Sequence, residues 1–153
     1  MTLKPEEWEL WETWTRAQRL LAREFDRRLQ RESGISKAEF SVLIRLRRAP
    51  GHEMRVADLC ESLDWEKSRV SHQLTRMENR GFVERTKSGP SGRRNRIGLT
   101  TKGHSAAESA THEHAGNIRR YFFDSLTPEQ TEALRTWSEH VVDLIEPPCD
   151  DVA

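Results

Sequence analysis

The fold is decided by residues 57–85, which read ADLCESLDWEKSRVSHQLTRMENRGFVER. The spacing of the apolar side chains predicts two helices in succession. The first, over residues 56–63, places Leu59 and Leu63 on one inward-facing side. The second has inward side chains at positions i, i+4 and i+7, and these are Val70, Leu74 and Met77. Two short helices in this order indicate a helix-turn-helix unit.

A β-hairpin is predicted directly after this unit. The second helix of the helix-turn-helix unit, which precedes this hairpin, is expected to begin at Asp64 or Glu66. Residues 82–86 (FVERT) and 96–100 (RIGLT) alternate as strands do, and residues 88–92 (SGPSG) are a turn-forming tip. The order helix, helix, hairpin predicts a winged helix-turn-helix, a mainly α fold with a small β-hairpin wing.

Further helices are predicted on both sides of the unit. Pro5 suits a first helical position, and apolar side chains at spacings of three and four continue to about Arg31. Ser36 and Glu39 form a capping box that opens another helix. A third helix is expected over residues 101–123, and a last one follows a capping box at 127–130.

Charge is distributed very unevenly along the 153 residues, although the net charge is zero. Residues 1–64 are balanced, whereas residues 65–102 carry 10 basic and 3 acidic side chains, net +7. Residues 103–153 carry 3 basic and 10 acidic side chains, net −7. A concentrated positive field of this kind is typical of a surface that binds phosphates.

The outer side of the second helix of the unit carries the residues expected to contact double-stranded DNA: Ser68, Arg69, Ser71, His72, Thr75 and Arg76. Arginine can donate two hydrogen bonds to guanine, and hydroxyl or imidazole groups can reach phosphates or bases. A solvated helix face more often mixes Glu with Lys, and this face has no acid. The hairpin adds four expected DNA contacts, Lys87, Arg93, Arg94 and Arg96, which suit a minor groove.

The quoted stretch resembles the core of the MarR family, and so does the segment at residues 99–103 (LTTKG), which is similar to the family's exit from the wing. The similarity is strongest over residues 40–103. The resemblance implies a regulator of transcription that binds DNA. In the family an Asp two residues before the groove-inserting arginine orients it. Here Arg93 takes the arginine position and Ser91 the Asp position, so the usual support is missing and Arg94 is a candidate to share the role.

The resemblance also implies a homodimer formed by the terminal helices, which would contact a pseudo-palindromic operator. The residues agree, since apolar side chains gather near both chain ends: Trp8, Trp11, Trp14, Leu134, Trp137, Val141 and Ile145. The expected organisation is a helical dimerisation region at residues 1–34 and 104–147, a winged helix-turn-helix DNA-binding domain at residues 35–103, and a tail at residues 148–153. Small aromatic effectors bind many relatives, and Trp11, Trp14 and Phe40 are the candidate lining of such a pocket.

Other functions are weighed against this one. His104, Glu108 and His112 are stacked along one predicted helix, so a metal-responsive regulator is an alternative, although a solvated surface is favoured. Cys60 is expected to be buried and inert, and Cys149 lies in an acidic tail, so redox sensing is disfavoured. A winged helix that serves only protein contacts is a further alternative.

Several classes of protein are excluded or disfavoured by the sequence. No nucleophile elbow, phosphate loop or zinc-hydrolase motif is present, so we expect no enzyme, no cofactor and no metal. No apolar run approaches a membrane span, and the first residues (MTLKPEEWELWE) are too acidic for a signal peptide. We therefore expect a cytoplasmic protein without membrane contact.

Overall fold

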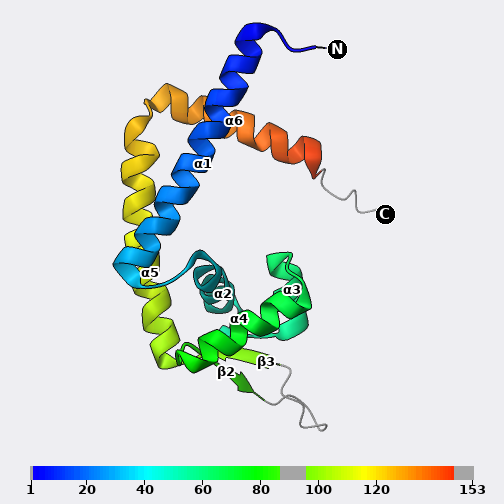
Figure 1. Ribbon diagram of the computed structural model, residues 1–153, viewed down its shortest axis with the longest axis vertical. Helices are drawn as coiled ribbons and strands as arrows, with labels where there is room; N and C mark the ends of the chain where they lie inside the picture. Colours follow the sequence, from blue (N-terminus) through cyan, green and yellow to red (C-terminus); the bar gives the residue numbers. More distant parts are fainter. Residues whose placement is uncertain (1, 87–95, 147–153) are drawn as a thin grey trace. The chain divides into compact units, whose positions relative to one another are not determined.

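The computed structural model describes residues 2–86 and 96–146 of the chain. By its internal contacts the chain divides into two compact units, residues 1–115 and residues 116–153. The elements, in chain order, are α1 (Pro5–Ser33), α2 (Lys37–Arg48), the 3-10 turn η1 (Pro50–His52), β1 (Glu53–Arg55), α3 (Val56–Leu63), α4 (Lys67–Asn79), β2 (Val83–Thr86), β3 (Arg96–Leu99), α5 (Thr101–Tyr121), the 3-10 turn η2 (Phe123–Ser125) and α6 (Pro128–Ile145). Figure 1 shows α2, α3, α4 and the hairpin strands gathered together within the first unit.

The helix ends follow local chemistry, as the sequence predicts. The Ser36 hydroxyl accepts a hydrogen bond from the backbone N–H of Glu39, and the Glu39 carboxylate accepts one from the backbone N–H of Ser36. The same reciprocal bonds join Thr127 and Gln130 at the start of α6. Gly34 adopts a left-handed conformation with φ of 64° and ends α1. Both capping boxes are confirmed.

A small antiparallel sheet completes the winged unit, with strand order β1-β3-β2. Glu84 is paired with Gly98 across the hairpin, and Met54 with Ile97 on the other side of β3. The predicted wing hairpin is therefore confirmed, and β1 joins it as a third strand. The mainly α fold with a small sheet agrees with the winged helix-turn-helix prediction.

One core lies beneath this sheet, and its buried residues come mainly from α2, α3 and α4, with further contributions from α1, β2, β3 and α5. The predicted inward side of α4 is confirmed, since Val70, Leu74 and Met77 are completely buried. Leu59 of α3 is buried with them. Cys60 is not, because the buried side of this eight-residue helix is narrow and Cys60 lies at its edge, half-buried beside Lys67 in a shallow hollow. The expectation of a buried thiol is therefore wrong.

Candidate nucleic-acid interface

Helix α4 separates its side chains cleanly into a buried side and a solvent side. Its buried side is set by the apolar stripe at 3.6-residue spacing, which packs against α2, α3 and β2. Its solvent side exposes all six residues that the sequence assigns to it, Ser68, Arg69, Ser71, His72, Thr75 and Arg76. No acidic side chain lies in the first turn. The exposed side is therefore rich in hydrogen-bond donors and carries only positive charge.

The turn before α4 is held by backbone hydrogen bonds. Asp64 adopts a left-handed conformation with φ of 51°, its N–H bonds to Glu61, and the N–H of Trp65 bonds to Cys60, both at 3.1 Å. This pair of bonds is the Schellman pattern, which commonly places an apolar residue after the left-handed one. Glu66 precedes the first helical residue of α4 without a side-chain cap. Of the two starts expected from the sequence, Glu66 is the correct one.

Trp65 and Arg69 are in direct contact. The guanidinium carbon of Arg69 lies 4.0 Å from the centroid of the Trp65 ring, a cation–π arrangement. The two residues are four positions apart, so they lie on one side of the helix entry. Sequence reasoning used Trp65 only as a boundary and missed this contact, although the i, i+4 spacing of an aromatic ring and an arginine could have indicated it.

The far end of α4 is fixed by an ion pair that sequence reasoning also missed. The Arg80 guanidinium donates to the Glu39 carboxylate at 2.6 Å and to the carbonyl of Gly34 at 3.0 Å. Burial alone would raise the pKa of Glu39, but hydrogen bonds from Ser36 and Arg80 outweigh it and leave the pKa below its ordinary value. The Lys102 ammonium donates to the Arg80 carbonyl at 2.8 Å. The end of α4 is thereby tied to the junction of α1 and α2 and to the start of α5.

The LTTKG segment owes its composition to a close approach of two backbones. The Thr100 hydroxyl donates to the carbonyl of Gly81 at 2.6 Å and accepts from the N–H of Gly103 at 3.0 Å. A Cβ at Gly103 would overlap the backbone carbonyl of Phe82. Glycine is required there because α5 starts against the residue that leads into the wing.

The expected wing contacts fall in two groups. Lys87, Arg93 and Arg94, together with Ser91, lie outside the residues that the structure describes. Arg96 lies in β3, where its guanidinium donates to the Glu53 carboxylate at 2.8 Å. Arg96 therefore joins β3 to β1 through its Nε, and Glu53 balances its charge.

The candidate effector-pocket residues are not brought together. Trp11 and Trp14 contact each other on α1 with ring centroids 5.4 Å apart. Phe40 instead contacts His114, which also contacts Phe25. Phe25 lies eleven residues beyond Trp14, which corresponds to about 16 Å along a helix. Burial lowers the pKa of His114, and the charge of Asp26 opposes that effect.

The histidines considered as metal ligands also separate. His104 contacts the ring of His52 with centroids 4.4 Å apart, whereas Glu108 and His112 are exposed further along α5. Over residues 2–86 and 96–146, no group of three or more His, Cys, Asp or Glu side chains is placed to hold a metal ion. Within the same residues, no helix has the length and apolar character needed to cross a bilayer.

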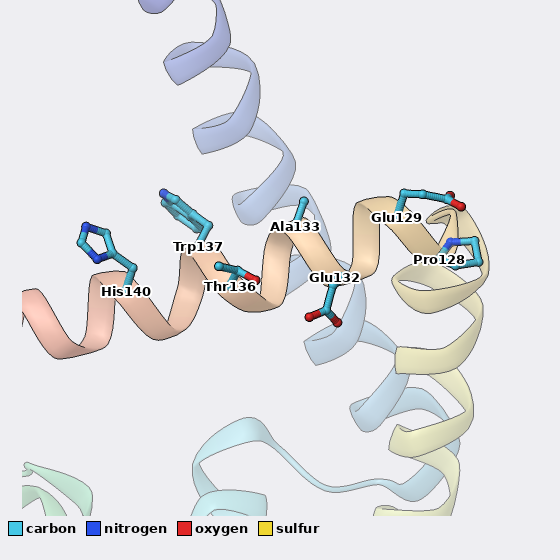
Figure 2. Close-up of a pocket in the computed structure, with 7 residues that line it drawn as sticks. All are labelled: Pro128, Glu129, Glu132, Ala133, Thr136, Trp137 and His140. Carbon is cyan, nitrogen blue, oxygen red and sulfur yellow. The ribbon is translucent and has the colours of Figure 1, made fainter.

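In the second unit, α6 carries a shallow hollow along one side. Its lining recurs every three to four residues: Pro128, Glu129, Glu132, Ala133, Thr136, Trp137 and His140. Figure 2 shows Trp137 and His140 projecting from the same side of the helix. Val142, Leu144 and Ile145 near the end of α6 are all more than half exposed. Helix α6 thus presents a long apolar surface.

Comparison with known proteins gives a consistent result. A model of the MarR family matches residues 33–94. AbsC, a MarR family transcriptional regulator from Streptomyces coelicolor, is 32% identical with a TM-score of 0.77, over 92% of this chain and 97% of that one. Sco3205, a MarR family transcriptional regulator of the same organism crystallised in complex with DNA, is 29% identical with a TM-score of 0.82, over 97% and 92%.

Two further comparisons complete this result. A mutant MarR from E. coli complexed with operator DNA shares the fold at 22% identity, with a TM-score of 0.68 over 84% of this chain and 92% of that one. No curated protein matches the sequence significantly. Identity of 32% along nearly the whole of AbsC is the decisive observation. The chain belongs to the MarR family of transcriptional regulators.

Proposed function

We propose that the protein is a homodimeric repressor that binds a pseudo-palindromic site in double-stranded DNA through the exposed side of α4. The observation that carries the proposal is the composition of that side, which has two arginines, a histidine and three hydroxyl residues exposed and no acid. Membership of a family of transcriptional regulators agrees with the absence of any enzyme motif in the sequence.

The geometry of α4 suits entry into a major groove. Residues near the start of a recognition helix contact base edges, and Arg69 occupies the first turn while Arg76 lies two turns further along. The start of α4 has no side-chain cap and no acid within its first turn, so its backbone N–H groups are open to a phosphate, although the N-cap residue Glu66 is itself acidic. The relatives crystallised with DNA, Sco3205 and the E. coli protein, support this role.

The wing and the dimer remain predictions within this proposal. Lys87, Arg93 and Arg94 are expected to enter the minor groove beside α4. Dimerisation through residues 1–34 and 104–147 is supported by exposed apolar side chains on α1 and on α6, among them Trp8, Leu10, Trp11, Leu144 and Ile145. Each square ångström of apolar surface removed from water contributes about 25 cal/mol, so burial of these side chains against a second copy would be strongly favourable.

Effector response and location complete the proposal. A small aromatic acid is expected to release the dimer from DNA by favouring a spacing of the two DNA-binding units that does not fit the operator. Titration calorimetry against a panel of aromatic acids, with and without bound DNA, tests this part. A protein that binds DNA works where DNA is found, so the cytoplasm is the proposed location.

Binding to DNA is tested with the full chain and a randomised duplex library. Wild-type protein is expected to enrich a pseudo-palindrome, and its affinity is expected to fall steeply with salt. Arg69→Ala and Arg76→Ala should weaken binding to the enriched duplex and relax its sequence preference, and Arg93→Ala should weaken binding to all sequences. Arg45→Ala, which replaces an exposed arginine of α2 outside the assigned DNA contacts and outside the dimerisation region, is the matched control and should change nothing. Unchanged affinity in all three α4 and wing variants would refute the assigned surface.

A further inference from the structure

Trp65 lies at the entry of α4 and is rigidly placed. Its backbone N–H donates to the carbonyl of Cys60, and its ring packs against the core while one part of it stays accessible. The left-handed residue Asp64 and the backbone bonds of the α3–α4 turn fix the direction in which the ring leaves the chain. The ring is therefore a fixed platform beside the first turn of α4.

Arg69 is the residue that uses this platform. Its guanidinium lies 4.0 Å from the ring centroid, and Arg69 makes no ion pair with any described residue. An exposed arginine otherwise samples many rotamers, and ordering it on binding costs entropy. Stacking on a flat ring restricts the guanidinium while leaving its N–H groups free to donate within the plane, which is the geometry that guanine recognition requires.

We propose that Trp65 is a positioning residue that holds Arg69 ready for base recognition and so sets the sequence preference of the protein. The inference rests on the proposed function, since it assumes that Arg69 contacts DNA. Trp65 itself need not touch a base. An exposed cation–π contact corresponds to about a two- to fivefold effect on an equilibrium constant, which sets the size of the expected change.

The test measures a ratio of affinities with the full chain. The probes are the duplex enriched from the random library by wild-type protein and a shuffled duplex of the same composition. Trp65→Leu keeps an apolar contact with the core and removes the ring, so the affinity ratio should fall about two- to fivefold while affinity for the shuffled duplex stays constant. Trp65→Phe keeps a ring and should restore most of the ratio. If Trp65→Leu has a clearly lower Tm than wild-type protein, Trp65→Met replaces it in the series.

A double-mutant cycle separates positioning from general stabilisation. In an Arg69→Ala background, Trp65→Leu should have no further effect on the ratio, whereas in an Arg76→Ala background it should keep its full effect. An equal effect of Trp65→Leu with and without Arg69, or a ratio that does not change, overturns the inference while leaving DNA binding intact. A higher ratio for Trp65→Leu also overturns it, because the ring would then hold Arg69 away from DNA. Failure of wild-type protein to enrich any sequence would instead refute the proposed function, and the inference with it.

Discussion

Replacement of Glu39 by glutamine removes one charge from the ion pair that ties α4 to the junction of α1 and α2. The Glu39 side chain is 4% exposed and that of Arg80 is 41% exposed, so Arg80 can turn to water but cannot recover an equivalent partner. A hydrogen bond to a charged group contributes ~1.5–3 kcal/mol. The amide that replaces the carboxylate can still accept from the N–H of Ser36, so we expect a loss of about 2 kcal/mol in the free energy of unfolding.

The assay is urea unfolding followed by circular dichroism at one fixed protein concentration, because an oligomer's stability depends on concentration. In a thermal melt of the same samples, about 2 kcal/mol corresponds to a fall in Tm of ~4–8 °C for a chain of this size. Folding lowers the pKa of Glu39 below its ordinary value of 4.5, so the unfolded chain binds more protons at low pH. The stabilisation is therefore complete above pH 4.5 and is lost as the pH falls through the folded pKa.

Two results would refute this reasoning. The first is an equal loss for Glu39→Gln and for the control Glu78→Gln. The Glu78 carboxylate, paired with Arg85 at 2.9 Å, is 31% exposed against 4% for Glu39, so that pair should contribute only ~0.2–1 kcal/mol. The second is a difference between wild-type protein and Glu39→Gln that is as large at pH 4 as at pH 7. Either result would mean that the carboxylate charge does not hold the end of α4.

Three further predictions follow from other parts of the chain. Gly103→Ala should destabilise the fold by more than ~3 kcal/mol, because its Cβ would overlap the carbonyl of Phe82. Gly116→Ala in the same helix meets no atom within 4 Å and should stabilise the fold by about 0.5–1 kcal/mol. Thermal unfolding measures both changes. His114→Phe should flatten the pH dependence of stability in urea titrations. Folding lowers the pKa of His114 below 6.5, so the neutral imidazole is compatible with the fold above pH 6.5, and stability is lost as the pH falls and the unfolded chain takes up the proton. Trp137→Glu should shift the proposed dimer toward monomer in sedimentation velocity, since the side chain is 47% exposed on the apolar surface of α6, and an unchanged sedimentation coefficient would count against that interface.

The sequence predicts well those features that depend on neighbours along the chain. The capping box at Ser36 and Glu39 needs only a spacing of three, and the buried stripe of α4 needs only the helical period. Features that join distant segments are not predicted. Arg80 pairs with Glu39 across 41 positions, and Arg96 pairs with Glu53 across 43 positions. A single sequence contains no signal for either pairing.

Those distant pairings change how the positive charge of residues 65–102 should be interpreted. Three of its arginines are held by carboxylates, in the pairs Arg80–Glu39, Arg85–Glu78 and Arg96–Glu53. Among the described residues, Arg69, Arg76 and Lys67 form no ion pair, and all three are exposed on α4. An arginine already paired with a carboxylate displaces few of the cations condensed on DNA, because its charge is largely neutralised before binding. The net charge of +7 therefore overstates the field available to DNA, because Glu39 and Glu53, which lie outside this stretch, neutralise Arg80 and Arg96, whereas the basic side chains of α4 keep their full charge.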